Sequence, residues 1–238
     1  MIGIDYDKNG IGEPVSRYKK PNVNKKYHVC NPATNDEFNS TKLGLQWQWQ
    51  ANYKSEWISL KAHKGWLRLY SQPEPQGYKN LFEVASLLLQ KFPAPQFTTT
   101  TKVLLTSEHT GDKAGLIVFG LDYSYIGIIK TETGFKISQF ICKDADEWNG
   151  EEEVDFIEVN NPLIYLRAEI KPENGDDIIP KVLCSFSYSL DGKTFKRIGK
   201  EFIAREGKWV GAKVGIFSST NYETNQKSFA DFDWFRFE

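Results

Sequence analysis

Short segments in which apolar and polar residues alternate follow one another along most of this chain. Residues 164–171 place Ile, Leu, Ala and Ile on one side and Tyr, Arg, Glu and Lys on the other, so one face is expected to be buried. Residues 96–106 alternate in a similar way, whereas residues 115–121 are apolar on both faces and are predicted to lie mid-sheet. A period of two indicates β-strands.

Turn signals separate these segments. The pair Asp191-Gly192 follows the apolar run at 182–189 and predicts a hairpin. Residues 229–237 are expected to form a buried strand that pairs inside a sheet. Only residues 80–91 have an apolar run that fits a helix, and it also fits a buried strand. Roughly a dozen strands at this spacing predict an all-β fold, an antiparallel β-sandwich of two sheets of the lectin-like jelly-roll type.

Composition adds a boundary and excludes some partners. Residues 1–30 are polar and rich in Lys, Pro and Asn, which is typical of a linker, and residues 31–238 are predicted to form the packed domain. Of 238 residues 40% are hydrophobic, enough for a large core, and the net charge is −1. Without a basic patch or an apolar run of roughly 18 residues, neither a nucleic acid nor a membrane is the expected partner.

The order of several short motifs resembles a known family. These motifs include Leu-Gln-Trp-Gln-Trp at 45–49, Gly-Trp-Leu-Arg-Leu-Tyr at 65–70, Leu-Leu-Gln-Lys-Phe-Pro at 88–93 and Gly-Lys-Trp-Val-Gly-Ala-Lys-Val-Gly at 207–215. Together they look like the C-terminal concanavalin A-like sandwich of two-domain glycoside hydrolase family 43 enzymes, the β-xylosidases and α-L-arabinofuranosidases. Residues 2–5 and 10–15 look like the end of the five-bladed propeller that precedes this sandwich.

The resemblance implies a non-catalytic accessory domain, because the acid and base carboxylates of that family belong to the propeller. It also implies that the sandwich packs on the propeller of the same parent chain and lends an aromatic residue to the mouth of its substrate pocket. The matching segment is residues 78–84, and Phe82 is the residue nominated, with ordinary core as the alternative. The implied substrate is a plant cell-wall pentose polysaccharide, and the implied location is extracellular or periplasmic.

Two other functions stay open from the residues themselves. Trp47 and Trp49 share a strand face and are candidates for a sugar platform, since aromatic faces stack on pyranose rings; core packing or docking of the propeller are the alternatives. Glu153, Asp155 and Glu158 match the Glu-x-Asp-x-x-Glu pattern of retaining glycanases, which need two carboxyls about 5–5.5 Å apart. A regular strand would place Glu158 opposite Glu153, so this second function requires a β-bulge.

A structural calcium ion is a further expectation. Asp231 and Asp233 lie on one side of the last strand, and Asp36 opens the first strand of the packed domain. If the first and last strands are neighbours, these carboxylates converge, and Ca²⁺ takes 6–8 oxygen ligands. The alternative is that the three residues are solvated strand ends or turn caps.

Overall fold

A computed structural model describes residues 3–19, 22, 24–26, 28, 30–173, 181–222 and 228–238. The chain divides into two compact units, Met1–Pro32 and Ala33–Glu238. The first unit holds a hairpin of β1 (Gly3–Tyr6) and β2 (Gly12–Val15). That residues 1–30 are the end of a propeller stays a prediction.

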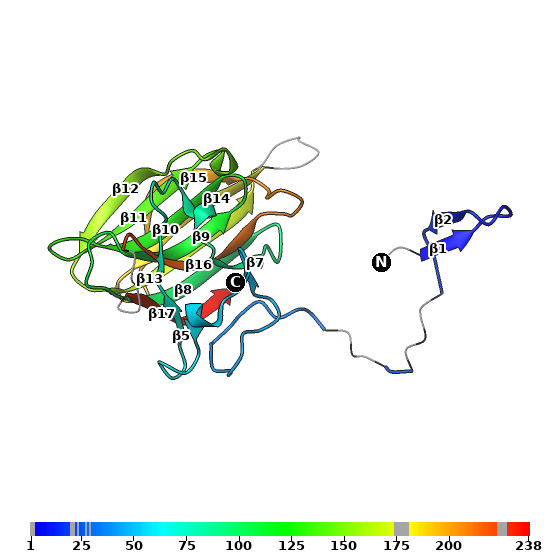
Figure 1. The fold of residues 1–238 in the computed structure, drawn as a ribbon, viewed down its shortest axis with the longest axis horizontal. Helices are drawn as coiled ribbons and strands as arrows, with labels where there is room; N and C mark the ends of the chain where they lie inside the picture. The colour runs from blue at the N-terminus through cyan, green and yellow to red at the C-terminus, as the bar shows by residue number, and fades with distance from the viewer. Residues whose placement is uncertain are drawn as a thin grey trace. The chain divides into compact units, whose positions relative to one another are not determined.

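The second unit consists of two stacked antiparallel sheets (Figure 1). One sheet has the strand order β12-β11-β10-β9-β16-β7-β3, with β6 pairing alongside β16, and the other has the order β15-β14-β13-β8-β17-β5-β4. The predicted all-β sandwich is therefore confirmed. The strands are β3 (Gln48–Trp49), β4 (Ile58–Ser59), β5 (Leu67–Tyr70), β6 (Gln72–Pro73), β7 (Leu88–Lys91), β8 (Phe97–Thr106), β9 (Lys113–Phe119), β10 (Tyr123–Lys130), β11 (Phe135–Cys142), β12 (Glu152–Val159), β13 (Leu163–Pro172), β14 (Val182–Ser189), β15 (Lys196–Ala204), β16 (Lys213–Thr220) and β17 (Phe229–Phe237).

The strands follow the sequence pattern closely. β13 alternates between buried and half-buried positions, whereas every residue of β9 is buried, as expected for a mid-sheet strand. β14 and β15 form a hairpin around Gly192, and β17 pairs with both β8 and β5, so the last strand lies inside its sheet. The ambiguous residues 80–91 contain the 3₁₀ turn η2 (Leu81–Glu83) and then β7.

The main core fills the space between the sheets. Leu116 and Val118 of β9 and Ile126 and Ile128 of β10 point into it, together with Leu166 of β13. Burying each such aliphatic side chain contributes about 1.5–3 kcal/mol relative to leaving it exposed. The alternate residues of β9 and β10 point to the outer face of the larger sheet, where a second buried cluster forms.

One buried glutamine of β11 joins the larger sheet to β15, the edge strand of the other sheet. The amide of Gln139 donates to the carbonyl of Lys200 (3.0 Å), and its oxygen accepts from the Lys200 N–H (2.7 Å). The neighbouring Gly199 has φ +72°, and a Cβ there would overlap the Gln139 side chain. Glycine is therefore needed for the sheets to approach so closely.

Two further 3₁₀ turns are η1 (Ser55–Trp57) and η3 (Ala145–Glu147). In the part of the chain that the structure describes, no helix is long and apolar enough to cross a membrane.

Candidate functional site

The outer face of the larger sheet carries a row of aromatic rings. Phe119, Tyr123, Tyr125 and Phe140 follow one another across β9, β10 and β11, with ring centroids 5.7, 6.4 and 5.0 Å apart. These rings are not open to solvent, because Leu81, Val84 and Leu87 pack on the same face. The segment around η2 thus covers a surface that would otherwise present an aromatic platform.

Phe82 lies on the outside of this covering segment. Its ring is half-buried and packs against Phe119 with centroids 4.8 Å apart. The segment is held by Asn80, which caps η2 through the Phe82 N–H (2.9 Å) and donates to the carbonyls of Ala145 (2.9 Å) and Asn149 (2.8 Å). Phe82 is therefore neither a deep core residue nor a free one, and its predicted role at a pocket rim stays a prediction.

A buried ionic cluster locks the segment onto the sheet. The ammonium of Lys113 lies 3.0 Å from Glu74 and 3.3 Å from Glu151, and Tyr123 donates to Glu151 at 2.6 Å. Burial raises the pKa of the Tyr123 and Tyr78 phenols well above the usual range, and the Glu151 carboxylate raises both further. Both phenols stay protonated at neutral pH and remain hydrogen-bond donors. The cluster satisfies the buried charges and closes the face.

Sequence reasoning missed this cluster, although it contains a signal. Lys113 begins a strand that is apolar on both faces, and a lysine buried there requires a carboxylate partner. Glu151 is the first acid of the run at 151–153, and it lies two residues before the start of the Glu-x-Asp-x-x-Glu pattern.

The Glu153, Asp155 and Glu158 pattern does occur on a bulged strand. The register of β12 against β11 shifts between Glu153 and Asp155. Glu153 forms an ion pair with Lys136 at 2.5 Å, and Glu158 is registered opposite the same lysine. Asp155 instead accepts the Gly199 N–H of β15 at 2.9 Å. Asp155 thus forms a contact between the two sheets.

Trp47 and Trp49 have different surroundings. Trp47 is buried between Phe38 and Phe235, and its indole N–H donates to Asp36 at 2.9 Å. Trp49 is half-buried and stacks on Tyr53, with centroids 5.3 Å apart. Trp49 and Tyr53 line a hollow of about 440 Å³. Trp47 is a core residue, whereas Trp49 borders this hollow, and its predicted role in a sugar platform stays a prediction.

The three aspartates predicted to bind calcium have other partners. The bridge between Asp36 and Phe235 confirms that the first and last segments of the sandwich are neighbours. Asp231 accepts from Arg68 (2.7 and 2.8 Å) and lies 2.9 Å from His63 Nδ1, while Asp233 pairs with Lys102 at 2.7 Å. Among the described residues no group of three or more His, Cys, Asp or Glu is arranged to hold a metal. A calcium ion at these aspartates stays a prediction.

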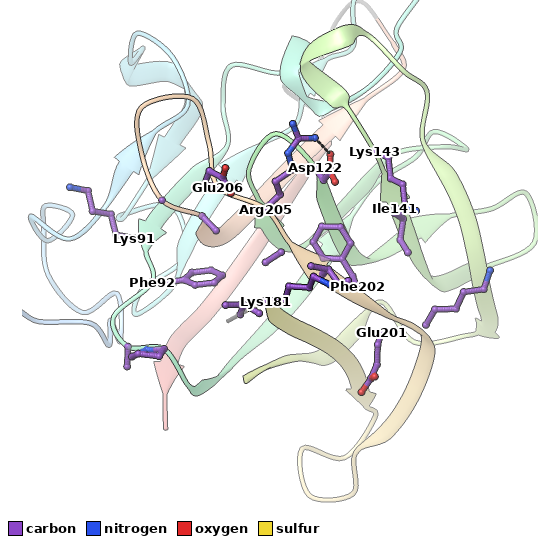
Figure 2. Close-up of a pocket in the computed structure, with 18 of the residues that line it drawn as sticks. Lys91, Phe92, Asp122, Ile141, Lys143, Lys181, Glu201, Phe202, Arg205 and Glu206 are labelled. Carbon is purple, nitrogen blue, oxygen red and sulfur yellow. Dashed lines mark hydrogen bonds and ion pairs between the residues drawn. The ribbon is translucent and has the colours of Figure 1, made fainter. Parts of the chain in front are cut away.

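A groove with a cavity volume of about 1150 Å³ lies at one end of the sandwich (Figure 2). Its floor is apolar, with Phe92, Ile141 and Phe202, and lysines stand on its rim. Arg205 at its margin pairs with Asp122 (3.1 Å), as Figure 2 shows, and with Asp144 (2.6 Å). These ion pairs fasten the loops after β9, β11 and β15 to one another.

Residues 35–238 match the family described as the β-xylosidase C-terminal concanavalin A-like domain. Over its whole length the chain is 31% identical to a protein named β-xylosidase from Formosa agariphila, of which it covers 40%. It is also 31% identical, over 92% of its length, to a putative β-xylosidase from Xylanibacter ruminicola, of which it covers 37%. The chain thus spans well under half the length of these relatives.

Solved structures show the same fold. A bifunctional glycoside hydrolase family 43 and carbohydrate esterase protein of Bacteroides eggerthii superposes with a TM-score of 0.76 at 24% identity, covering all of this chain and 30% of that one. A xylan β-1,4-xylosidase of Bacillus halodurans superposes with a TM-score of 0.72 at 18% identity, and there the chain covers 46%.

Proposed function

Because the chain belongs to the family of β-xylosidase C-terminal concanavalin A-like domains, we propose that it is a non-catalytic accessory domain of a family 43 glycosidase. Its partner is the catalytic five-bladed propeller of the same parent chain. Its work is to stabilise that propeller and to shape the rim of its substrate pocket. The substrate is a plant cell-wall pentose polysaccharide of the xylan or arabinan type, and the enzyme works outside the cytoplasm.

One observation carries the proposal. The outer face of the larger sheet, with its row of aromatic rings, is filled by the chain's own segment around η2 and closed by the Lys113 cluster. A closed face supports a scaffold more than an open binding platform. The same segment carries Phe82, whose ring is half-buried against Phe119, and we infer that its remaining exposed edge faces the second domain.

The test uses the catalytic domain of the parent enzyme, produced with and without this chain. We expect the catalytic domain to melt at a lower temperature when alone and to regain stability when the chain is added, because binding to the folded state stabilises it. Equal stability and equal activity on nitrophenyl xylosides and arabinofuranosides, with and without the chain, would contradict the proposal. Detection of the parent enzyme only in the cytoplasmic fraction would contradict the proposed location.

Phe82 is tested in the same mixture. We expect Phe82→Ala to lower kcat/KM about tenfold, equivalent to roughly 1.4 kcal/mol of lost transition-state binding, without changing the melting temperature by more than about 2 °C. Phe156→Ala, which removes an exposed ring on β12, is the matched control and should leave kcat/KM unchanged. If Phe82→Ala and Phe156→Ala have the same kcat/KM, Phe82 does not contribute to the pocket rim.

A second candidate function is sugar binding, favoured by the hollow beside Trp49 and Tyr53. The Tyr53 side chain is 51% exposed, so its ring is accessible to a pentose unit. Calorimetric titration with xylo- and arabino-oligosaccharides tests this function. A heat of binding that is measured with the unaltered chain and lost in Tyr53→Ala would support a carbohydrate-binding module. A flat trace with the unaltered chain counts against it.

The retaining-glycanase alternative rests on Glu153 and Glu158 alone, because Asp155 is bonded across to β15. A reducing-sugar assay on β-glucan, with Glu153→Gln as the comparison, tests it. Absence of turnover by the unaltered chain would remove this alternative.

A further inference from the structure

A row of arginines and small hydroxyl residues crosses the outer face of the seven-stranded sheet. On β13, Leu166 and Ala168 point into the core, so Arg167 between them points outward. The strand registers align five residues in one row from β17 through β8, β13 and β14 to β15, namely Arg236, Thr100, Arg167, Ser187 and Arg197. Because neighbouring strands are about 4.8 Å apart, arginines two strands apart have backbones roughly 10 Å apart.

The arginines at the two ends of this row are paired with carboxylates. Arg236 donates two bonds to Glu37, both of 2.7 Å. Arg197 lies 3.3 Å from Glu169 and 3.6 Å from Glu201. The chain therefore compensates the positive charge at both ends of the row with its own acids.

Arg167, at the centre of the row, has different surroundings. Its Nε donates to the Thr100 hydroxyl at 3.1 Å, and its guanidinium carbon lies 3.6 Å from the centre of the Phe195 ring. Within the described parts of the chain, no carboxylate pairs with this half-buried side chain. A guanidinium that is stacked on a ring and held at Nε keeps its plane fixed, and its two terminal nitrogens remain available as donors.

Two aromatic rings adjoin the row on one side. Tyr165 precedes Arg167 by two residues on β13, so the two side chains leave the same face roughly 7 Å apart. Trp234 of β17 lies next to Tyr165, with ring centroids 6.3 Å apart, and both rings are half-buried. The uncompensated guanidinium is thus bordered by apolar ring edges, which is the mixed surface that a sugar ring with one charged substituent requires.

We propose that Arg167 binds the carboxylate of a uronic acid carried by a polysaccharide that lies on this face. The planar fork of the guanidinium matches a carboxylate, and its two terminal nitrogens would donate two parallel bonds to the two oxygens. Since the ends of the row are neutralised, the row has one surplus positive charge, which suits a sparsely charged sugar polymer and not a polyanion such as a nucleic acid. That the carboxylate belongs to a polysaccharide rests on the proposed function.

Calorimetric titration of the full chain with two probes tests the site. The probes are xylotetraose with a single glucuronosyl branch and unbranched xylotetraose. We expect the unaltered chain to bind the acidic oligosaccharide at least tenfold more tightly than the neutral one. Arg167→Gln should remove this difference, and Arg167→Lys, which keeps the charge but loses the planar fork, should retain only part of it.

Arg197→Gln is the matched control, because it removes the same charge from the same row at an arginine that already has carboxylate partners. It should change the affinity for the acidic oligosaccharide less than twofold. Melting temperatures measured without ligand show which variants are folded. If Arg167→Gln does not fold, Arg167→Lys and the comparison of the two probes on the unaltered chain still decide the outcome.

Three results would overturn the carboxylate site. They are equal affinity of the unaltered chain for both probes, absence of binding by the acidic one, and equal losses in Arg167→Gln and Arg197→Gln. If a hexaglutamate peptide binds through Arg167 and the acidic oligosaccharide does not, the ligand is an acidic protein segment and the inference is wrong. The accessory function is judged separately, by stabilisation of the catalytic domain. A chain that binds the acidic probe through Arg167 but does not stabilise that domain keeps the carboxylate site and loses the accessory function.

Discussion

At the scale of single residues, Asp191 shows how one carboxylate fixes a turn. Its Oδ1 accepts the N–H groups of Lys193 (2.8 Å) and Thr194 (2.9 Å) and the hydroxyl of Ser189 (2.8 Å). These bonds, the Thr194 one above all, lower the pKa of Asp191 from 3.8 to about 2. The hairpin predicted from Asp191-Gly192 therefore depends on the charged form of this side chain.

The consequence is a pH-dependent stability. A lowered pKa in the folded state means that the charged carboxylate stabilises the fold above pH 3.8, and this contribution is lost as the pH falls toward 2. We expect Asp191→Ala to have a lower free energy of unfolding than the unaltered chain above about pH 5. This difference in free energy should shrink between about pH 4 and 2. Urea unfolding of both proteins across this pH range measures the difference. A gap that stays constant with pH would contradict the assignment.

Asp231 illustrates a buried ion pair. Its carboxylate is nearly inaccessible and accepts two bonds from Arg68, whereas the pair of Asp233 with Lys102 is more open to solvent. Removing one partner of a buried pair leaves the other charge uncompensated, so Asp231→Asn should cost about 3 kcal/mol of unfolding free energy. Asp233→Asn is the matched control and should cost less than about 1 kcal/mol. Equal losses in chemical denaturation would mean that Arg68 is well solvated.

The calcium prediction belongs to the same aspartates. An ion bound by Asp36, Asp231 and Asp233 would raise the melting temperature when CaCl₂ replaces EDTA, since it would bind only the folded state. Asp231→Asn should then abolish the response. Identical melting curves in CaCl₂ and EDTA would remove the prediction.

At the scale of elements, β16 is an inner strand of the larger sheet. It pairs with β9 on one side and β7 on the other, and Gly215 lies at both pairings. A Cβ at Gly215 would lie 2.1 Å from the Leu88 carbonyl oxygen and 2.7 Å from the Leu89 Cα. No side chain fits there unless the backbone of β7 moves.

Gly215→Ala should therefore destabilise the sandwich by about 3 kcal/mol or more, at the upper end of what overpacking costs. Gly150→Ala is the control, because a Cβ there meets nothing within 4 Å, and its effect should stay within about 0.5 kcal/mol. Guanidinium unfolding compares the two. A small effect at Gly215 would mean that β7 can shift away from β16.

At the scale of the whole molecule, the sandwich carries its own core. The buried hydrophobic residues of the described chain all belong to the unit Ala33–Glu238. We expect a chain that starts at Ala33 to melt within about 2 °C of the full chain. A chain that starts at Thr41 also loses Asp36, which is bridged to Phe235 of β17, and Phe38, which stacks on Trp47 in the core, and it should melt more than about 5 °C lower. Scanning calorimetry measures both, and a large drop for the first truncation would contradict this view.

The sequence by itself determined the fold class, most strand positions and the family. Strand alternation and turn chemistry are local, so β13, β14 and the Asp191-Gly192 hairpin were readable from residues close in the chain. What only the tertiary structure decided depends on partners far apart in sequence. The bulge in β12, the separation of Asp155 from Glu153, and the Lys113–Glu74–Glu151 cluster arise when distant strands meet. Likewise, no local signal predicts that the segment around η2 and the loops after β9, β11 and β15 meet, because long-range contacts of Asn80, Asp122 and Arg205 hold them together.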